Sequence, residues 1–338
     1  MIFRDYCSHT RRDQRQRWRR FCARPIKRYH QVPTHHCFEQ CSEVSAEARV
    51  LRDGHSGCIR QFPNGLLTMR ICLIFTVMLA TLMSFAAQAY AGKFVEFETG
   101  GGQSNQVRII GYLARPEGSG PFPAVVVLHG CGGFHQDMLA WADRLRQWGY
   151  AALAVDSFGP RGIEQACVGF GDQPADAFRA LAYLKTLAYV SADQVAILGF
   201  SMGGISVLAA LERGSVSDLY PDKFRAGVAL YPKCSGSSGI MTAPTLVLTG
   251  ALDDWNPASE CEAMAAGRSE LGISRFPGDR SLVQLIIYPD AHHGFDLAGL
   301  RFSNGIKVSG HRMEYNDAVT RDSIEKVRTF FRQTLRHE

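Results

Sequence analysis

The stretch Val195-Ala-Ile-Leu198, followed by Gly199-Phe-Ser201-Met-Gly203-Gly204, decides the fold of this chain. Its four apolar residues predict a short buried strand, and a helical pattern over 202–212 begins directly after the turn. Between them lies G-x-S-x-G in a strand-turn-helix context, which is typical of a nucleophile elbow. Glycines on both sides of Ser201 let neighbouring backbone pass close to a strained turn, so the pattern predicts an exposed serine at a helix N-terminus.

Apolar runs and helical patterns alternate along most of the chain. Runs rich in β-branched residues and bounded by Gly, Pro or Asp predict buried strands over 107–113, 124–128, 151–155, 195–198, 226–231, 245–249 and 282–288. Apolar residues at three-to-four spacing predict helices over 138–148, 174–187, 202–212, 257–268 and 316–335. This alternation predicts one α/β domain at 92–338, with a mostly parallel central sheet, helices on both faces and an antiparallel edge strand at 93–98.

Two candidate partners for Ser201 follow later strands. Asp253 comes in the loop after the strand at 245–249, and His293 comes in the loop after the strand at 282–288. The carboxyl ends of parallel strands meet at one edge of a sheet, and the order Ser, Asp, His is the one this fold uses for a catalytic triad. Motif position favours Asp253 over Asp254 and His293 over His292.

Acyl transfer also needs backbone N–H donors for an oxyanion. The residue after the nucleophile, Met202, supplies one candidate. The apolar strand at 124–128 runs into His129-Gly-Cys131-Gly-Gly133, whose glycines allow close approach to a substrate, and Cys131 supplies the second candidate. We expect His129 to order this loop by hydrogen bonding.

Residues 93–338 resemble the dienelactone hydrolase family of α/β-hydrolases. The matching marks are the loop at 129–133, Gly199–Gly204, and the segments 156–162, 250–257 and 288–295. The resemblance implies an α/β-hydrolase fold and hydrolysis of carboxylic esters or lactones. The name-giving enzymes have a cysteine nucleophile where this chain has Ser201, and both side chains perform acyl transfer through a tetrahedral intermediate.

Fewer signals identify substrate contacts. Arg161 is a candidate for binding a substrate carboxylate, as arginines do in relatives that accept acidic lactones. Trp255 and Phe295, beside the predicted acid and base, are candidate pocket walls. Asp172 and Asp176 are expected at a solvated helix start. Segments 159–171 and 298–311 are expected to cover the site, although neither contains a motif.

The N-terminal part of the chain differs in composition from the rest. The whole chain has 338 residues, 46% hydrophobic and 20% charged, which excludes wholesale disorder. Its net charge is +5, but residues 1–68 alone carry 13 basic and 6 acidic residues. The Arg-rich run at 11–28 shows no nucleic-acid-binding fold, and the His and Cys residues at 35–41 lack a second pair at zinc-finger spacing. We expect no nucleic-acid partner and no metal.

A secretory signal peptide is predicted at 69–91. Met69-Arg70 is followed by about 15 apolar residues and then by small residues, which favour cleavage after Ala89 or after Ala91. The apolar stretch is shorter than the roughly 20 residues of a membrane span, so no stable membrane anchor is expected after cleavage. Residues 1–68 are interpreted as an upstream extension outside the native protein or a disordered basic tail, with translation from Met69 and export to the periplasm or medium.

Export bears on the cysteines, because an oxidising compartment permits disulfides. Cys234 and Cys261 are a candidate pair, and Cys131 with Cys167 is a second one. The sequence leaves open whether either pair is bonded or whether all four are buried thiols.

Together these patterns predict an exported serine hydrolase that acts on a small ester or lactone without a cofactor. Two alternatives stay open. One is a peptidase or amide hydrolase on the same fold, because fold and triad determine chemistry more closely than substrate. The other is a non-catalytic member that uses the fold as a ligand cavity. The oligomeric state has no signal in the sequence.

Overall fold

The computed structural model describes residues 91–98, 108–167, 172–268 and 281–335, all within the unit Phe85–Glu338. The predicted tail at 1–68 and the predicted signal peptide at 69–91 lie outside the described residues, apart from Ala91. In the described part of the chain, no helix has both the length and the apolar character needed to cross a membrane.

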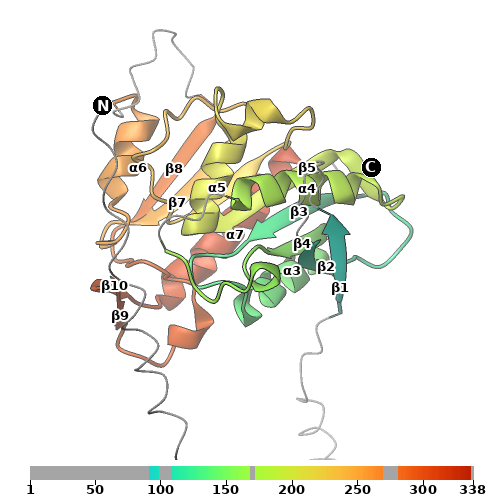
Figure 1. Ribbon diagram of the computed structural model, residues 1–338. Coiled ribbons are helices and arrows are strands. Elements are labelled where there is room, and N and C mark those ends of the chain that lie inside the picture. The colour runs from blue at the N-terminus through green and yellow to red at the C-terminus, as the bar shows by residue number, and fades with distance from the viewer. Residues whose placement is uncertain (1–90, 99–107, 168–171, 269–280, 336–338) are drawn as a thin grey trace, which may run out of the picture. The chain divides into compact units, whose positions relative to one another are not determined.

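One sheet of eight strands forms the centre of this unit, in the order β1-β2-β4-β3-β5-β6-β7-β8 (Figure 1). Strand β2 pairs antiparallel with β1 and β4, and the other pairs are parallel. This confirms the predicted sheet and its antiparallel edge strand. The strands are β1 (Lys93–Glu98), β2 (Arg108–Ala114), β3 (Phe122–Leu128), β4 (Ala151–Asp156), β5 (Val190–Phe200), β6 (Gly227–Leu230), β7 (Thr245–Gly250) and β8 (Val283–Tyr288).

Helices cover both faces of the sheet, as predicted (Figure 1). Trp141 and Phe331 belong to a buried cluster on one face, and Leu181, Leu208 and Met264 belong to a buried cluster on the other. Each cluster joins helix side chains to one side of the alternating strand residues, so the sheet separates two apolar cores. The helices are α3 (Gln136–Gln147), α4 (Gln173–Lys185), α5 (Met202–Leu211), α6 (Ala258–Ala265) and α7 (Asp317–Thr334).

Strand β5 is longer than its apolar run. It begins at Val190, which pairs with Phe122 of β3, and the register shifts before the pairing of Ala124 with Val195. Residues 191–194 are Ser-Ala-Asp-Gln, so no apolar pattern marks them as a strand. Residues on both sides of this polar segment, Val190 and Val195, pair with β3, and the segment lies where the register shifts.

Several short elements lie outside the predicted pattern. They are the 3-10 helices η4 (Gly159–Arg161), η5 (Val216–Leu219) and η6 (Ala298–Leu300), and the two-stranded sheet of β9 (Ile306–Val308) and β10 (His311–Met313). Three-residue strands are too short to show a period.

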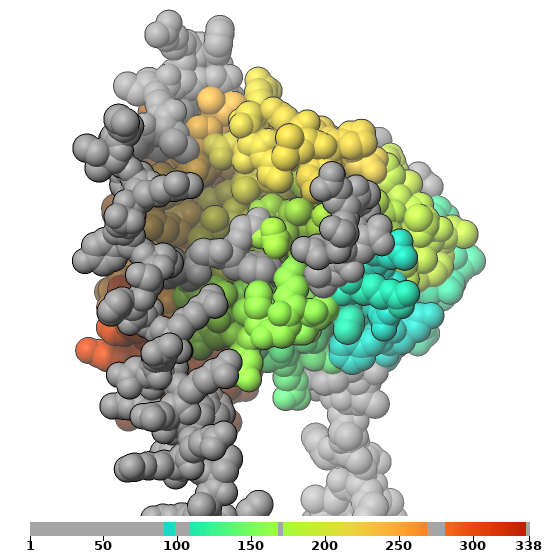
Figure 2. Space-filling view, in the orientation of Figure 1, coloured from blue at the N-terminus to red at the C-terminus, as the bar shows by residue number. Residues whose placement is uncertain are grey.

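In the space-filling view, the segment between α5 and β7 (yellow) covers the top of the face on which α4 (green) and β1 (cyan) lie (Figure 2).

The strand order changes direction at β3. The next strand along the chain, β4, lies on one side of β3, and β5 lies on the other. The loop after β3 leads into α3 on one face of the sheet, and the loop after β5 leads into α5 on the other face, so the two loops diverge. Such a switch point leaves a crevice at the carboxyl ends of the strands, where open α/β sheets bind ligands. The loop at 129–133 and Ser201 both lie at this edge.

Candidate active site

Ser201 occupies a tight turn between β5 and α5. Its φ is 52° and its ψ is −113°, a conformation that L-residues rarely adopt. The turn is held on both sides, because Ser201 N donates to Leu230 O at 2.9 Å and Ile205 N donates to Ser201 O at 3.0 Å. The predicted elbow therefore exists as a strained turn at the start of a helix.

The glycines of the elbow allow α5 to lie against the sheet. A Cβ placed on Gly199 would lie 2.1 Å from Gly203 O, and one on Gly203 would lie 2.5 Å from Leu128 O. Both contacts are to backbone, which cannot rotate away as a side chain can. Larger residues at these positions would therefore displace the turn that positions Ser201.

Ser201, His293 and Asp253 form a hydrogen-bonded chain. Ser201 Oγ lies 3.0 Å from His293 Nε2, and His293 Nδ1 lies 2.8 Å from Asp253 Oδ2. A carboxylate only accepts, so the Nδ1 proton points to Asp253 and Nε2 is left to accept from the serine hydroxyl. The three side chains come from the loops after β5, β7 and β8. These loops lie close together because the parallel strands end at the same edge of the sheet.

The loop of Asp253 fixes the carboxylate. Its Oδ1 accepts from Trp255 N at 2.9 Å and from Asn256 N at 2.8 Å, which leaves Oδ2 for His293. Asp253 and His293 are both buried, while Ser201 is partly accessible. The geometry thus presents one reachable hydroxyl in front of a buried, oriented imidazole.

The neighbouring residues Asp254 and His292 have other contacts. Asp254 Oδ1 accepts from Arg312 N at 3.0 Å, and His292 Nδ1 lies 2.8 Å from Leu252 O. The structure therefore brings Asp253 and His293, the pair favoured by motif position, to Ser201.

The amides of Cys131 and Met202 have no protein acceptor within the described residues. Met202 is the first residue of α5, where a helix has no intrahelical acceptor for its N–H. The loop of Cys131 approaches closely, since a Cβ on Gly130 would lie 3.5 Å from Ser201 Cβ. Both amides are therefore available to a ligand beside the serine.

His129 orders this loop, as the sequence predicts. Its Nε2 accepts from Ser157 N at 3.2 Å, and its Nδ1 lies 2.7 Å from Gly130 O. Its carbonyl accepts from Gln173 Nε2 at 3.0 Å. Burial lowers the pKa of His129, which is fully enclosed, and the hydrogen bond to Gly130 opposes that effect. The contacts fit a neutral imidazole protonated at Nδ1.

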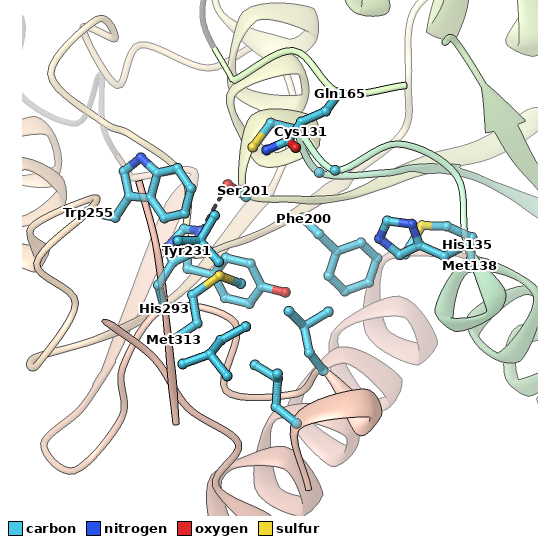
Figure 3. A pocket seen from close by; sticks show the side chains of 16 residues that line it. Cys131, His135, Met138, Gln165, Phe200, Ser201, Tyr231, Trp255, His293 and Met313 are labelled. Carbon is cyan, nitrogen blue, oxygen red and sulfur yellow. Dashed lines mark hydrogen bonds between the residues drawn. The ribbon is translucent and has the colours of Figure 1, made fainter. Parts of the chain in front are cut away.

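A cavity of about 300 Å³ opens in front of Ser201 (Figure 3). Trp255 lines it beside His293, with the two ring centroids 5.1 Å apart. Its other lining residues are mainly apolar and come from the loop after β3, from α3, from η6 and from the β9–β10 hairpin. The volume is at the lower end of the range for small-molecule pockets.

Tyr231 is a cavity residue that no sequence motif marked. Its ring contacts His293 at a centroid distance of 4.8 Å, and its hydroxyl donates to Asp296 Oδ1 at 2.6 Å. Burial raises the pKa of Tyr231, and the negative charge of the neighbouring Asp296 raises it further. Burial also raises the pKa of Asp296. The sequence showed Tyr231 only as the end of a strand, so no local pattern could have identified its contact with His293.

Arg161 lies elsewhere, contrary to its predicted contact with substrate. Its guanidinium makes two hydrogen bonds to Asp176, at 2.7 and 2.9 Å, and donates to Ser157 O at 2.7 Å. It does not line the cavity. Asp176, expected at a solvated helix start, is instead fully buried, while Asp172 occupies the N-cap position of α4 without a side-chain capping bond. The buried carboxylate binds the arginine, which corrects both predictions.

Phe295, predicted as a pocket wall, does not line the cavity. It is fully buried and packs edge-on against Tyr231 and Tyr288, with centroid distances of 5.2 and 5.6 Å. The cavity lining does not include it, because Tyr231 stands between it and the site. Phe295 therefore supports a pocket wall from behind.

Two disulfides connect the four cysteines of the described residues, one between Cys234 and Cys261 and one between Cys131 and Cys167. The second ties the loop after β3 to the segment that follows η4. Ala166 N also donates to Cys131 O at 3.0 Å. The position of the Cys131 amide thus depends on a covalent link that the sequence offered as the second of two candidate pairs.

No group of three or more metal-ligating side chains lies close together in the described parts of the chain.

Known proteins of similar sequence match the body of the chain. It is 25% identical over 248 residues to a protein of Methylorubrum extorquens named "Putative carboxymethylenebutenolidase", covering 66% of this chain and 76% of the relative. A shorter match, 36% identical over 110 residues, is to the quorum-quenching protein AidA of Acinetobacter baumannii, covering 31% of this chain and 36% of the relative.

Solved structures show the same fold. A dienelactone hydrolase-like promiscuous phosphotriesterase from metagenomic libraries matches with a TM-score of 0.55 and 24% identity, covering 73% of this chain and all of that one. The sequence pattern of the dienelactone hydrolase family matches residues 109–335, which include the whole hydrogen-bonded chain of Ser201, Asp253 and His293. The chain therefore belongs to the dienelactone hydrolase family, with the α/β-hydrolase fold.

Proposed function

We propose that this chain is a serine hydrolase that cleaves carboxylic esters or lactones through an acyl-enzyme intermediate. The observation that carries the proposal is the hydrogen-bonded chain from Ser201 Oγ through His293 to Asp253. A serine hydroxyl is a weak nucleophile until an adjacent base accepts its proton. His293 Nε2 is oriented to do so, and Asp253 supports the imidazolium that forms.

The proposed reaction runs in two stages. Ser201 Oγ attacks the carbonyl carbon while its proton passes to His293 Nε2. The tetrahedral intermediate then expels the alcohol oxygen, which takes the proton from His293, and the acyl group stays on Ser201. A water molecule, deprotonated by His293, attacks the acyl-enzyme, and the released serine oxygen regains a proton from the imidazolium. In a lactone, acid and alcohol leave as one molecule.

Cys131 N–H and Met202 N–H are the proposed oxyanion donors. Both lie beside Ser201 and have no acceptor in the part of the chain that the structure describes, so they can donate to the negative oxygen of the tetrahedral intermediate. Removing one such donor in a serine protease lowers kcat by about 10²–10³-fold, which shows the scale of this contribution. Family membership supports hydrolysis, and the name of a relative, "Putative carboxymethylenebutenolidase", supports lactones among the substrates.

A fluorophosphonate probe tests the nucleophile. We expect intact-mass spectrometry to find one adduct per folded protein chain and peptide mapping to place it on Ser201. Ser201→Ala removes the adduct and the hydrolysis of 4-nitrophenyl acetate, whereas Ser119→Ala, in an exposed turn, keeps both. Absence of the adduct from well-folded wild-type protein would favour the ligand-binding alternative. An adduct accompanied by amide cleavage but no ester or lactone cleavage would favour the peptidase alternative.

We also propose that the protein is exported through the signal peptide at 69–91. The two disulfides support this, because disulfides persist in oxidising compartments. Expression from Met69 in a bacterial host, followed by cell fractionation and N-terminal sequencing, tests it. Mature protein that begins at Tyr90 or Gly92 in the periplasm or medium is expected, and uncleaved protein confined to the cytoplasm would contradict export.

A further inference from the structure

The β9–β10 hairpin presents an apolar face to the cavity and a charged face away from it. Ile306 and Val308 line the cavity, while Lys307, between them on the strand, does not. On β10, Met313 lines the cavity and Arg312 does not. Successive side chains of a strand point to opposite faces, so the hairpin separates apolar from charged residues in the same way on both strands.

The pairing of the two strands supports this division. Ile306 pairs with Met313, Val308 pairs with His311, and Lys307 pairs with Arg312, so the face toward the cavity is apolar apart from His311 and the other face is basic. Arg312 on the outer face forms an ion pair with Glu314 at 2.6 Å. The side chains of Lys307 and Arg312 are thus directed away from the site.

The hairpin is attached to the loops that hold the predicted acid and base. Arg312 N donates to Asp254 Oδ1 at 3.0 Å, and Glu314 N donates to His293 O at 3.3 Å. The ring of His311 stacks on Trp255, with centroids 5.2 Å apart and planes inclined by 17°. These contacts fix the apolar face at the site rather than leaving it as a free loop.

Most other lining residues are apolar, and the polar side chains of His135 and Gln165 also line the cavity. Leu297 and Leu300, three residues apart around η6, extend the apolar surface, and Met138 and Phe200 close the opposite side (Figure 3). The lining contains no Lys, Arg, Asp or Glu among the described residues. The arginine predicted to receive a substrate carboxylate is bound to Asp176 instead.

We propose that the hairpin and η6 select neutral esters or lactones whose alkyl or aryl group fills the cavity, and that they reject substrates with a carboxylate on that group. The inference rests on the proposed function and names its substrate class. A carboxylate inside this wall would lose its hydration and find no lysine or arginine among the described lining residues, which is costly. An apolar group of the same size would be transferred from water to an apolar surface, which is favourable.

Matched substrate pairs test this selection. One pair is 4-nitrophenyl hexanoate and the mono-4-nitrophenyl ester of adipic acid, which differ by a terminal carboxylate on the acyl side. The other is phenyl acetate and 4-carboxyphenyl acetate, which differ on the alcohol side. At about pH 8, where unperturbed histidines are neutral, we expect the neutral member to have a kcat/KM more than about tenfold higher in at least one pair. Ratios below that value in both pairs would overturn the proposal.

Ile306→Arg tests the assignment to the hairpin, with Ile306→Gln as the matched uncharged control. Ile306 is 41% exposed, so the site can accept a longer polar side chain. The arginine variant should lower the discriminating ratio by at least about fivefold, because it offers the carboxylate a partner, while the glutamine variant should change it by less than about twofold. A smaller effect of arginine, or an equal effect of glutamine, would remove the hairpin from substrate selection.

Fluorophosphonate labelling separates the possible failures. If Ser201 is labelled but the neutral esters are not preferred, the selection is wrong and the proposed serine hydrolase stands. If Ser201 is not labelled in folded protein, the proposed function itself fails. Labelling of both Ile306 variants to one adduct per chain shows that their nucleophiles are intact.

Discussion

Asp253 touches the reacting serine only through His293. In Asp253→Asn, an amide NH₂ can face His293 Nδ1 and favour the tautomer with its proton on Nε2, which cannot accept from Ser201. We expect kcat for an ester to fall by about 10³–10⁴-fold. The matched control Asp290→Asn, an exposed carboxylate near the same edge of the sheet, should keep kcat within about twofold. Steady-state kinetics checks both, and a loss of less than tenfold in Asp253→Asn would argue against the roles assigned here.

The ion pair between Arg161 and Asp176 contributes to the stability of the fold. Asp176 is fully buried, and its hydrogen bonds to Arg161 balance its lost hydration. Arg161→Met should lower the free energy of unfolding by about 3–5 kcal/mol, because it leaves a buried charge with reduced compensation. The double variant Arg161→Met with Asp176→Leu should recover part of this loss. Urea unfolding measures both, and equal losses in the single and double variants would contradict the account.

Helix α5 and strand β3 meet through the elbow glycines. Gly203→Ala would bring a Cβ to 2.5 Å from Leu128 O, so the helix must move and Ser201 must move with it. We expect a stability loss of about 3 kcal/mol and a large loss of ester hydrolysis. Gly236→Ala is the matched control, because a Cβ there meets nothing within 4 Å. Thermal unfolding and kinetics should leave that control close to wild type, and an unaffected Gly203→Ala would show that the contact can relax.

The two disulfides join different elements, so removing them should affect kcat differently. Their sequence separations are 36 for Cys131–Cys167 and 27 for Cys234–Cys261, so removing either should cost a similar amount, about 4 kcal/mol in the chain-entropy account. Only the first holds the loop that presents the Cys131 amide. Replacing that pair by alanine should therefore lower kcat by at least about tenfold, whereas replacing Cys234 and Cys261 should leave kcat within about threefold at a temperature where both proteins are folded.

Intact-mass analysis before the assay confirms that neither double variant carries an unintended cross-link. Equal losses of kcat in the two double variants, at equal folded fractions, would show that the Cys131–Cys167 bridge has no specific effect on the oxyanion donors.

Stability of the whole unit should depend on pH through His129. Burial lowers the pKa of His129 below its ordinary 6.5, so the unfolded chain binds a proton more readily than the folded one. Its contribution to stability is therefore complete above pH 6.5 and is lost as pH falls below that value toward the folded-state pKa. We expect the free energy of unfolding, measured by urea titration, to decline over this interval.

A glutamine at this position separates His129 from the other titrating groups. His129→Gln should show a smaller decline in unfolding free energy below pH 6.5 than the wild type, since it has no proton to bind. Equal slopes for His129→Gln and the wild type would assign the acid sensitivity to other groups.

For the whole molecule, local patterns predicted the sheet and the edge where the site lies. Buried parallel strands are almost entirely apolar and short, so their order and approximate bounds are visible in the sequence, and only polar residues 191–194 of β5 escaped this rule. Because parallel strands end at one edge, the loops of Ser201, Asp253 and His293 could be expected to meet. Each of these three residues also stands in a recognisable motif.

The sequence by itself therefore determined the strand-turn-helix around Ser201, the order of the three side chains and the family resemblance, because each depends on neighbours along the chain or on a regular period. Only the tertiary structure decided that Arg161 binds Asp176, that Tyr231 rather than Phe295 faces the cavity, and that a short hairpin forms its apolar wall. These outcomes depend on contacts between segments far apart in sequence. A buried carboxylate takes the cation that reaches it, and no local pattern encodes which one that is.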